Sequence, residues 1–395
     1  MTNTFDAIVV GSGISGGWAA KELTEHGLKT LLVERGRNVE HIKDYTGTEK
    51  NPWDLPHRGQ ETQKDYTDSP IQSECYAYDE VSKHFFVNDR EHPYNQVKPF
   101  KWIRGYQVGG RSLLWGRQCY RWSDLDFDAN AREGIAVDWP IRYKDVAAWY
   151  DRVESFIGVS GQKEGLAHLP DGPFLPPMAM NCVETHVAER IRASFPGERL
   201  MTIGRAAVLT APLNGRSACH YCGPCHRGCI TRSYFSALNA TLPAAEATGR
   251  MTLRPYSIVR HLTVDRATGN VSGVHVIDAQ TRASVEFRAR IVFLCASAIE
   301  SSRILLNSRT DQHPEGVANS SGQVGRNIMD HIKWGGATGQ FDGWADRRIT
   351  GARPNGIYVP RFRNVSSRHQ DFVRGYGFQG SGSRSEEHTS ELQSR

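Results

Sequence analysis

The 395-residue sequence has no apolar run long enough to cross a membrane and no block of basic residues interleaved with aromatics. The first absence argues against a transmembrane span. The second argues against a nucleic-acid ligand, because the formal net charge of +5 is spread along the chain. The N-terminus has no basic region followed by an apolar core and a cleavage site, so we expect no signal peptide of its own. We therefore expect a cytoplasmic protein, with co-export to the periplasm beside a partner subunit as the alternative.

No internal repeat is visible, and with 39% hydrophobic and 23% charged residues the composition is that of a globular protein with room for two domains. Residues 380–395 depart from this composition because they are polar and contain few apolar side chains. Their final part resembles the in-frame translation of a sequencing-library adapter. We therefore expect the natural reading frame to be cut near Gln379, and we exclude residues 380–395, as a non-native tail, from fold predictions.

The start of the chain carries a dinucleotide-binding pattern. A strand over residues 5–10 runs into a Gly-x-Gly-x-x-Gly turn made by Gly11, Gly13 and Gly16. A helix follows over residues 18–26, and a second strand over residues 29–33 ends in the acid Glu34. In this βαβ unit Gly11 permits a tight turn, Gly13 lets the backbone approach a pyrophosphate, and Gly16 lets the helix pack on the strand. Glu34 is expected to accept hydrogen bonds from ribose hydroxyls.

The rest of the chain alternates between irregular and regular stretches. Residues 37–99 are rich in Asp, His, Pro, Tyr and Gln, and we interpret them as a lid or functional loop. A fully apolar strand near the end of the pattern is typical of a central parallel sheet, so we expect the chain to return to its first domain. The expected elements are helices over residues 143–157 and 183–195, strands over 253–264, 271–279, 284–287 and 289–296, and a helix over 298–307.

A second glycine loop contains Gly109, Gly110 and Ser112. Paired glycines beside a small hydroxyl residue suit a backbone that passes close to a flat ligand. Taken alone, this loop is best explained by a plain glycine turn.

Four of the eight cysteines crowd into one loop with the spacing C-x2-C-x2-C-x3-C: Cys219, Cys222, Cys225 and Cys229. Thiolates this close in sequence favour one compact iron–sulfur cluster. Structural zinc more typically draws its ligands from two distant knuckles, and a disulfide framework is not expected without a signal peptide. Zinc, disulfides and free thiols stay open as alternatives. The scattered cysteines are most simply buried thiols: Cys75, Cys119, Cys182 and Cys295.

Five motifs, in order between residues 5 and 331, resemble the glucose-methanol-choline (GMC) oxidoreductase family. They are the βαβ unit ending in Glu34, Arg35 and Gly36, the Gly109 loop, Trp139-Pro140-Ile141, the strand-to-helix turn at 293–298, and the run from Val324 through Asp330 to His331. The resemblance implies an α/β fold: an FAD-binding Rossmann-like domain of the glutathione reductase type, an α+β substrate domain, and a missing C-terminal part.

The same resemblance implies a division of the chain. The FAD-binding domain comprises residues 1–36, about 100–135 and 250–331, and residues 37–99 form the lid. The substrate domain comprises about 136–249 and 332–379 and includes the cysteine loop at 219–229.

The resemblance also implies the site residues. FAD contacts are expected at Gly11, Gly13, Ser15, Gly16, Glu34, Arg35, Gly109, Gly110, Ser112, Val259 and Ala296. Leu113 and Leu114 stand where some related flavoenzymes carry a tethering His, so we expect FAD to be bound non-covalently. Family members place the catalytic His, with a second His or Asn, in a C-terminal segment. We therefore expect the base beyond the break and do not assign this role to His331 or to the other histidines.

Cys219, Cys225 and Cys229 further resemble cluster ligands of the branch that holds gluconate and fructose dehydrogenases and bacterial FAD-dependent glucose dehydrogenases. This implies a dehydrogenase that oxidises a CH-OH group of a sugar, sugar acid or polyol. Electrons would pass through a [3Fe-4S] or [4Fe-4S] cluster to a cytochrome c acceptor, with a small subunit as partner. The alternatives are a GMC alcohol oxidase with a structural zinc loop, and a truncated flavin-binding fragment that lacks its catalytic pair.

Overall fold

The computed structural model describes residues 3–48, 50–223, 225–330, 335–344, 346–347, 349, 351–368 and 371–383. The chain divides into two compact units. Unit 1 comprises the described residues within 1–115, 226–230 and 236–334, and unit 2 comprises those within 116–225, 231–235 and 335–395. The expected lid, residues 37–99, thus falls in unit 1. His331 and the adapter-like stretch from Arg384 onward lie outside the described residues.

The strands are β1 (Thr4–Val10), β2 (Thr30–Val33), β3 (Thr202–Ile203), β4 (Met251–Arg254), β5 (Ser257–Val264), β6 (Val271–Asp278), β7 (Ser284–Leu294), β8 (Ile357–Val359) and β9 (Phe378–Gly380). The α-helices are α1 (Ile14–Glu25), α2 (Gln63–Asp68), α3 (Asp124–Phe127), α4 (Ala129–Glu133), α5 (Tyr143–Ile157), α6 (Cys182–Ser194), α7 (Leu242–Ala247) and α8 (Ala298–Asn307). Short helical turns are η1 (Pro52–Asp54), η2 (Pro56–Gly59), η3 (Gln72–Glu74), η4 (Lys83–Phe85), η5 (Gly110–Leu113), η6 (Cys225–Arg227) and η7 (Ala237–Thr241). Across the described ranges, we find no helix with the length and apolarity that crossing a bilayer requires.

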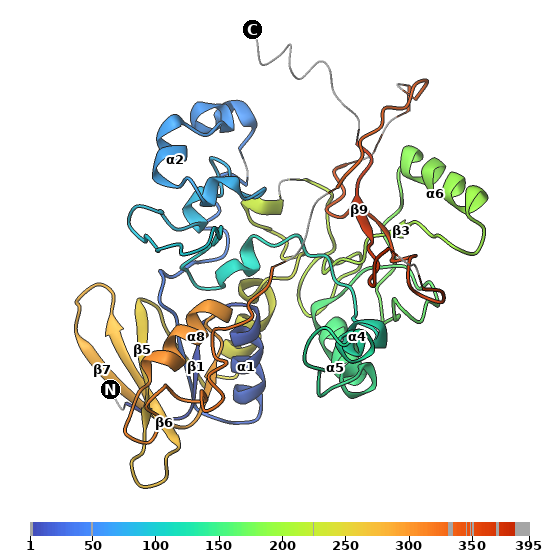
Figure 1. The fold of residues 1–395 in the computed structure, drawn as a ribbon. Coiled ribbons are helices and arrows are strands. Elements are labelled where there is room, and N and C mark those ends of the chain that lie inside the picture. Colours follow the sequence, from blue (N-terminus) through green and yellow to red (C-terminus); the bar gives the residue numbers. More distant parts are fainter. Residues whose placement is uncertain are drawn as a thin grey trace. The chain divides into compact units, whose positions relative to one another are not determined.

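Unit 1 is built on a six-stranded mixed sheet with the order β4-β2-β1-β7-β6-β5. Figure 1 labels four of its strands, β1, β5, β6 and β7. β1 pairs in parallel with β2 and β7, and β2 pairs in parallel with β4. β5, β6 and the first half of β7 form an antiparallel meander. The chain therefore returns to its first sheet after a long excursion, as predicted, and the predicted α/β fold class is confirmed.

Two predicted strand boundaries are wrong. The strands expected over 284–287 and 289–296 are one continuous strand, β7, because no turn residue separates them and Arg288 pairs on both sides, with Gly273 and with Thr4. Conversely, the strand expected over 253–264 is broken into β4 and β5. Pro255 has no backbone N–H to donate, and Tyr256 takes a left-handed conformation with φ of 54°.

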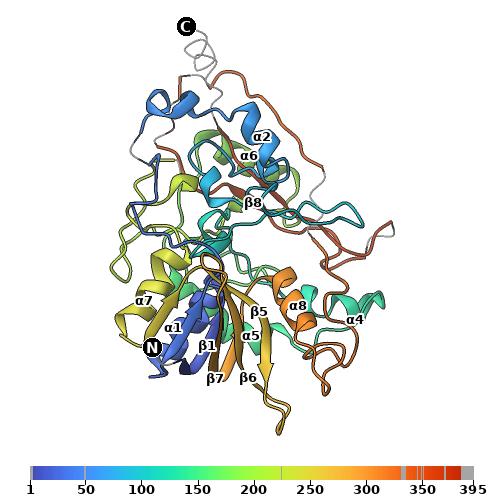
Figure 2. The ribbon, with the colours of Figure 1, turned by 90° about the vertical axis from the view of Figure 1, so that its left-hand side faces the viewer.

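Alternation along β1 buries both faces of the sheet. Ile8 and Val10 pack in a core that includes Ile304 of α8. Ala7 and Val9 point the other way, into a core that includes Leu23 of α1 together with residues of α7. One face of the sheet is thus covered by α8. The other face is covered by α1 and α7, which lie side by side (Figure 2). An apolar strand covered on both faces is typical of a parallel sheet.

Unit 2 contains a small antiparallel sheet with the order β3-β8-β9. Tyr358 of β8 stacks on Tyr120 with ring centroids 4.0 Å apart. The predicted helix over 143–157 is α5, and its buried Glu154 accepts a 3.0 Å hydrogen bond from Nε of the buried Arg121. This ion pair fastens α5 to the segment that opens the unit.

Candidate functional site

The three glycines of the first turn have different surroundings. Gly11 has a φ of +96°, and a Cβ on it would lie 2.5 Å from the carbonyl oxygen of Cys295. A Cβ on Gly16 would lie 1.7 Å from the carbonyl oxygen of Gly11. A Cβ on Gly13 would meet no described atom within 4 Å. Gly11 and Gly16 are therefore required by packing, whereas Gly13 faces open space that a ligand can enter.

This open space lies at the N-terminus of α1. Gly13 is the N-cap residue, and it offers no side-chain cap to the first turn, which also carries no acidic residue. The N–H groups of a first helical turn have no partner inside the helix, and together with the helix dipole they attract an anion. Ser15 and Gly16 belong to this turn. The turn therefore fits the pyrophosphate of a dinucleotide, as the sequence pattern predicts.

Glu34, at the end of β2, is buried and already holds three donors. Its Oε2 accepts from the backbone N–H of Ser12 at 3.1 Å and from the Ser12 hydroxyl at 2.7 Å. Its Oε1 accepts from the N–H of Gly36 at 3.0 Å. Burial raises the pKa of Glu34 above its ordinary 4.5, and the hydrogen bonds from Gly36 and Ser12 oppose this rise. Oε1 retains a lone pair that could accept from a ribose hydroxyl.

The second glycine loop lies against the first. The N–H of Gly109 donates to the Ser12 hydroxyl at 3.1 Å, and a Cβ on Gly110 would lie 3.4 Å from the Cα of Gly13. The Ser112 hydroxyl donates to the Gly109 carbonyl at 2.5 Å and accepts from the N–H of Ala237 at 3.0 Å. The structure thus brings residues 97 positions apart in the sequence into direct contact.

Sequence reasoning missed Ser12, which occupies the variable position between Gly11 and Gly13. Its hydroxyl is the one group that touches both the Glu34 carboxylate and the Gly109 loop among the hydrogen bonds described above. The signal in the sequence was the small hydroxyl side chain itself, which stands between two glycines of the turn.

The other predicted contacts are placed as follows. Arg35 stacks on Tyr106, with its guanidinium carbon 3.7 Å from the ring centroid, and it pairs with Glu300 at 2.5 Å. Val259 is buried in β5, and Ala296 packs against the same core cluster. Thus Arg35 shares the Glu300 carboxylate with Arg303, which lies 2.6 Å from it. The roles of these residues toward a cofactor stay predictions.

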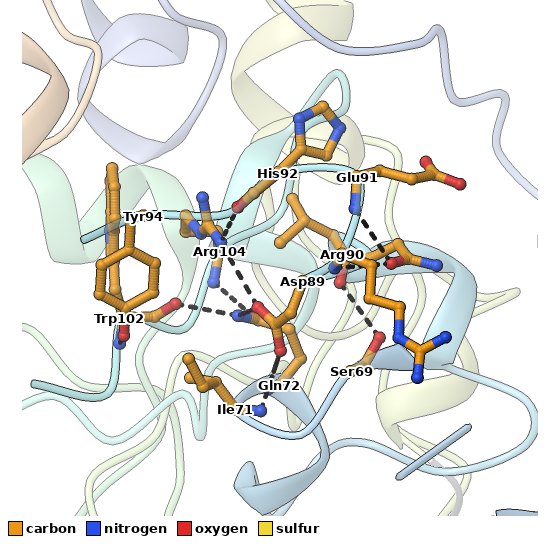
Figure 3. Close-up of polar contacts among 12 residues, drawn as sticks. Ser69, Ile71, Gln72, Asp89, Arg90, Glu91, His92, Tyr94, Trp102 and Arg104 are labelled. Carbon is orange, nitrogen blue, oxygen red and sulfur yellow. Dashed lines mark hydrogen bonds and ion pairs between the residues drawn. The ribbon is translucent and has the colours of Figure 1, made fainter. Parts of the chain in front are cut away.

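The expected lid has a buried polar core (Figure 3). Gln72, Asp89 and Arg104 are only 0%, 8% and 4% exposed. Gln72 Nε2 donates to Asp89 at 2.9 Å, and Gln72 Oε1 accepts from the N–H of Arg104 at 2.7 Å. Arg104 Nη2 donates to the carbonyl of His92 at 2.6 Å and lies 3.4 Å from the Asp89 carboxylate. Residues 37–99 therefore share a buried polar core with the following Arg104 and are not a structureless loop.

The cysteine loop spans the boundary between the two units, with Cys219, Cys222 and Cys225 in unit 2 and Cys229 in unit 1. The N–H of Cys219 donates to the carbonyl of Leu209 at 2.8 Å, and Cys222 is exposed. Among the described residues, no group of three or more His, Cys, Asp or Glu side chains is arranged to hold a metal ion. The assignment of these four thiols to a cluster therefore stays a prediction from their spacing.

Part of this loop is held by the lid within unit 1. His226 contacts the Asp79 carboxylate through Nε2 at 2.5 Å, and the Thr48 hydroxyl donates to the carbonyl of Arg227 at 3.1 Å. A Cβ on Gly228 would lie 2.3 Å from the ring of Tyr45. The backbone between the last two cysteines is thus packed onto the lid.

Comparison with known proteins shows the family of the chain. The profile of the GMC oxidoreductase family matches residues 5–333. The chain is 27% identical over 397 residues to 2-methyl-1,2-propanediol dehydrogenase of Mycolicibacterium austroafricanum, a match that covers 95% of this chain and 63% of the relative. It is 25% identical to the fructose dehydrogenase large subunit of Gluconobacter japonicus, over 84% of this chain and 59% of the relative. It is 24% identical to the gluconate 2-dehydrogenase flavoprotein of Pantoea cypripedii, over 82% of this chain and 55% of the relative.

The chain thus spans between 55% and 63% of the length of these relatives. The last two of them are from the branch that the sequence analysis singled out. Because the family profile matches most of the sequence, as the resemblance predicted, the chain belongs to the GMC oxidoreductase family.

Proposed function

We propose that the chain is the flavin-binding part of a dehydrogenase that oxidises a CH-OH group of a sugar, sugar acid or polyol. The observation that carries the proposal is the meeting of two glycine loops in unit 1. Gly13 has open space beside the uncapped N-terminus of α1, and Gly110 lies against it. The names of the relatives, a diol dehydrogenase, a fructose dehydrogenase and a gluconate dehydrogenase, support this substrate class.

The family implies FAD as the cofactor, and the residues of unit 1 fit it. The first turn of α1 would hold the pyrophosphate, with Gly13 giving it room. Glu34 Oε1 would accept from the adenosine ribose, and the Gly109 loop would lie under the ring system. When bound, FAD accepts a hydride from the carbon that carries the hydroxyl. The loop offers only the apolar Leu113 and Leu114 at the expected tether position, which supports non-covalent binding.

Substrate-dependent bleaching of the flavin tests the activity directly. Sugars, sugar acids, diols and choline are offered anaerobically to the FAD-loaded protein, and reoxidation is followed with an artificial one-electron acceptor. The proposal expects bleaching by at least one of these hydroxyl substrates. Bleaching by none of these substrate classes would contradict it.

An alcohol oxidase is the second candidate, because two further relatives, 27% and 28% identical to this chain, are named as oxidases. Oxygen consumption separates the two candidates. A dehydrogenase reoxidises faster with the artificial acceptor than with oxygen, whereas an oxidase produces hydrogen peroxide in step with substrate.

The finer part of the proposal, an iron–sulfur cluster at Cys219, Cys222, Cys225 and Cys229, is supported by spacing alone. A cytochrome acceptor and a small partner subunit depend on it, as does periplasmic export beside that subunit. Iron and acid-labile sulfide are measured on anaerobically purified protein, with Cys225→Ser as the comparison and Cys119→Ser as the control. Stoichiometric zinc, or no metal at all, would contradict the cluster and leave the flavin proposal standing.

A further inference from the structure

We infer that Ser12 is a positioning residue that couples the two ends of the cofactor site. Its hydroxyl joins the Glu34 carboxylate, at the adenosine end, to the Gly109 amide, at the flavin end. We refer to these three groups as the Ser12 bridge. The inference rests on the proposed flavin-binding function and adds to it a residue that the glycine pattern leaves unspecified.

The geometry gives the Ser12 hydroxyl a defined role in each direction. Ser12 is fully buried, and its single hydroxyl proton is donated to Glu34 Oε2 at 2.7 Å. A hydroxyl has only one proton, so its lone pairs stay available on the other side. One of them accepts from the Gly109 N–H at 3.1 Å. The direction of both hydrogen bonds is therefore fixed by the carboxylate.

The conformation of the Gly109 peptide unit is held by hydrogen bonds on both of its sides. Gly109 and Gly110 have φ values of +87° and +50°, which are left-handed conformations. The Gly109 N–H is held by Ser12, and its carbonyl is held by the Ser112 hydroxyl. Removing the Ser12 hydroxyl leaves a buried donor on Gly109 and a buried acceptor on Glu34 without this partner. The loop then loses its tie to the acid, even though the N–H of Ser12 still reaches Glu34.

Binding of ADP, a fragment of FAD, shows whether Ser12 couples the two ends of the cofactor site or acts at the adenosine end alone. FAD and ADP share the pyrophosphate and ribose contacts, but ADP has no ring system to touch the Gly109 loop. We expect Ser12→Ala to weaken FAD binding by about tenfold, the size of one lost hydrogen bond with a buried partner, and to weaken ADP binding clearly less. Ser12→Thr keeps the hydroxyl and should recover most of the FAD affinity.

The measurement is calorimetric titration of the apoprotein with FAD and with ADP, for the wild type and each variant. Ser272→Ala on β6, outside the site, is the matched control. If Ser12→Ala fails to fold, Ser12→Cys gives the same comparison, because a thiol is only a weak acceptor. Equal losses for FAD and ADP, or no loss for either, would overturn the coupling while leaving the proposed function intact. A wild-type chain that binds no FAD would overturn both.

Discussion

At the scale of single residues, the glycines of the first turn predict opposite phenotypes. Gly13→Leu places a side chain in open space, so the free energy of unfolding of the apoprotein should change by no more than about 0.5 kcal/mol while FAD binding is lost. Gly16→Ala forces a Cβ against the Gly11 carbonyl and should cost roughly 1–3 kcal/mol of stability. Urea unfolding and FAD titration of both variants check this pair. Tight FAD binding by Gly13→Leu would refute the placement of the pyrophosphate.

Glu34 predicts a pH dependence of stability. Burial raises its pKa above the ordinary 4.5, so the folded chain holds this proton more tightly than the unfolded chain does. The protonated acid therefore adds to the free energy of unfolding below pH 4.5, and this contribution disappears as the pH rises through the raised pKa of the folded chain. Glu34→Gln has no titrating group at this position, so its stability should not change with pH in this way. Melting temperatures from pH 4 to 8 should therefore fall more with pH for the wild type than for Glu34→Gln, with the exposed Glu315→Gln behaving as the wild type. Parallel curves for all three proteins would refute the assignment.

At the scale of elements, the stability of the lid should depend on its polar core. Asp89→Ala leaves the Arg104 guanidinium buried without its carboxylate, which typically costs about 3–5 kcal/mol. Glu91→Gln, two residues away and exposed, is the control (Figure 3). Urea unfolding should show the loss, and limited trypsin digestion should cleave between residues 63 and 104 faster in Asp89→Ala. Equal behaviour of the two variants would show that this core does not hold the segment.

Elements with a strong local signal were predictable from the sequence, and elements held by distant partners were not. α8 begins and ends where the pattern placed it, and α5 follows Pro140 as expected, because amphipathic periodicity is a local property. β7 was divided in the prediction because its two halves pair with different neighbours. The lid core was missed because Gln72 and Arg104 meet across 32 residues with no periodic pattern. The Ser12 bridge was missed for the same reason.

At the scale of the whole molecule, the chain consists of two units, and the site described above lies entirely within the first. Unit 1 brings together the glycine turn at Gly13, the acid Glu34 and the Gly109 loop. The fold of this unit and the family agree with each other, and the family implies FAD as the cofactor.

Titration of the apoprotein with FAD, followed by acid precipitation, measures both how the flavin binds and whether it is tethered. We expect saturable binding of one FAD per chain, release of all flavin into the acid supernatant, no competition by NAD, and loss of binding in Gly13→Leu. Absence of saturable FAD binding, preferential binding of NAD, or flavin that stays in the precipitate would contradict this expectation.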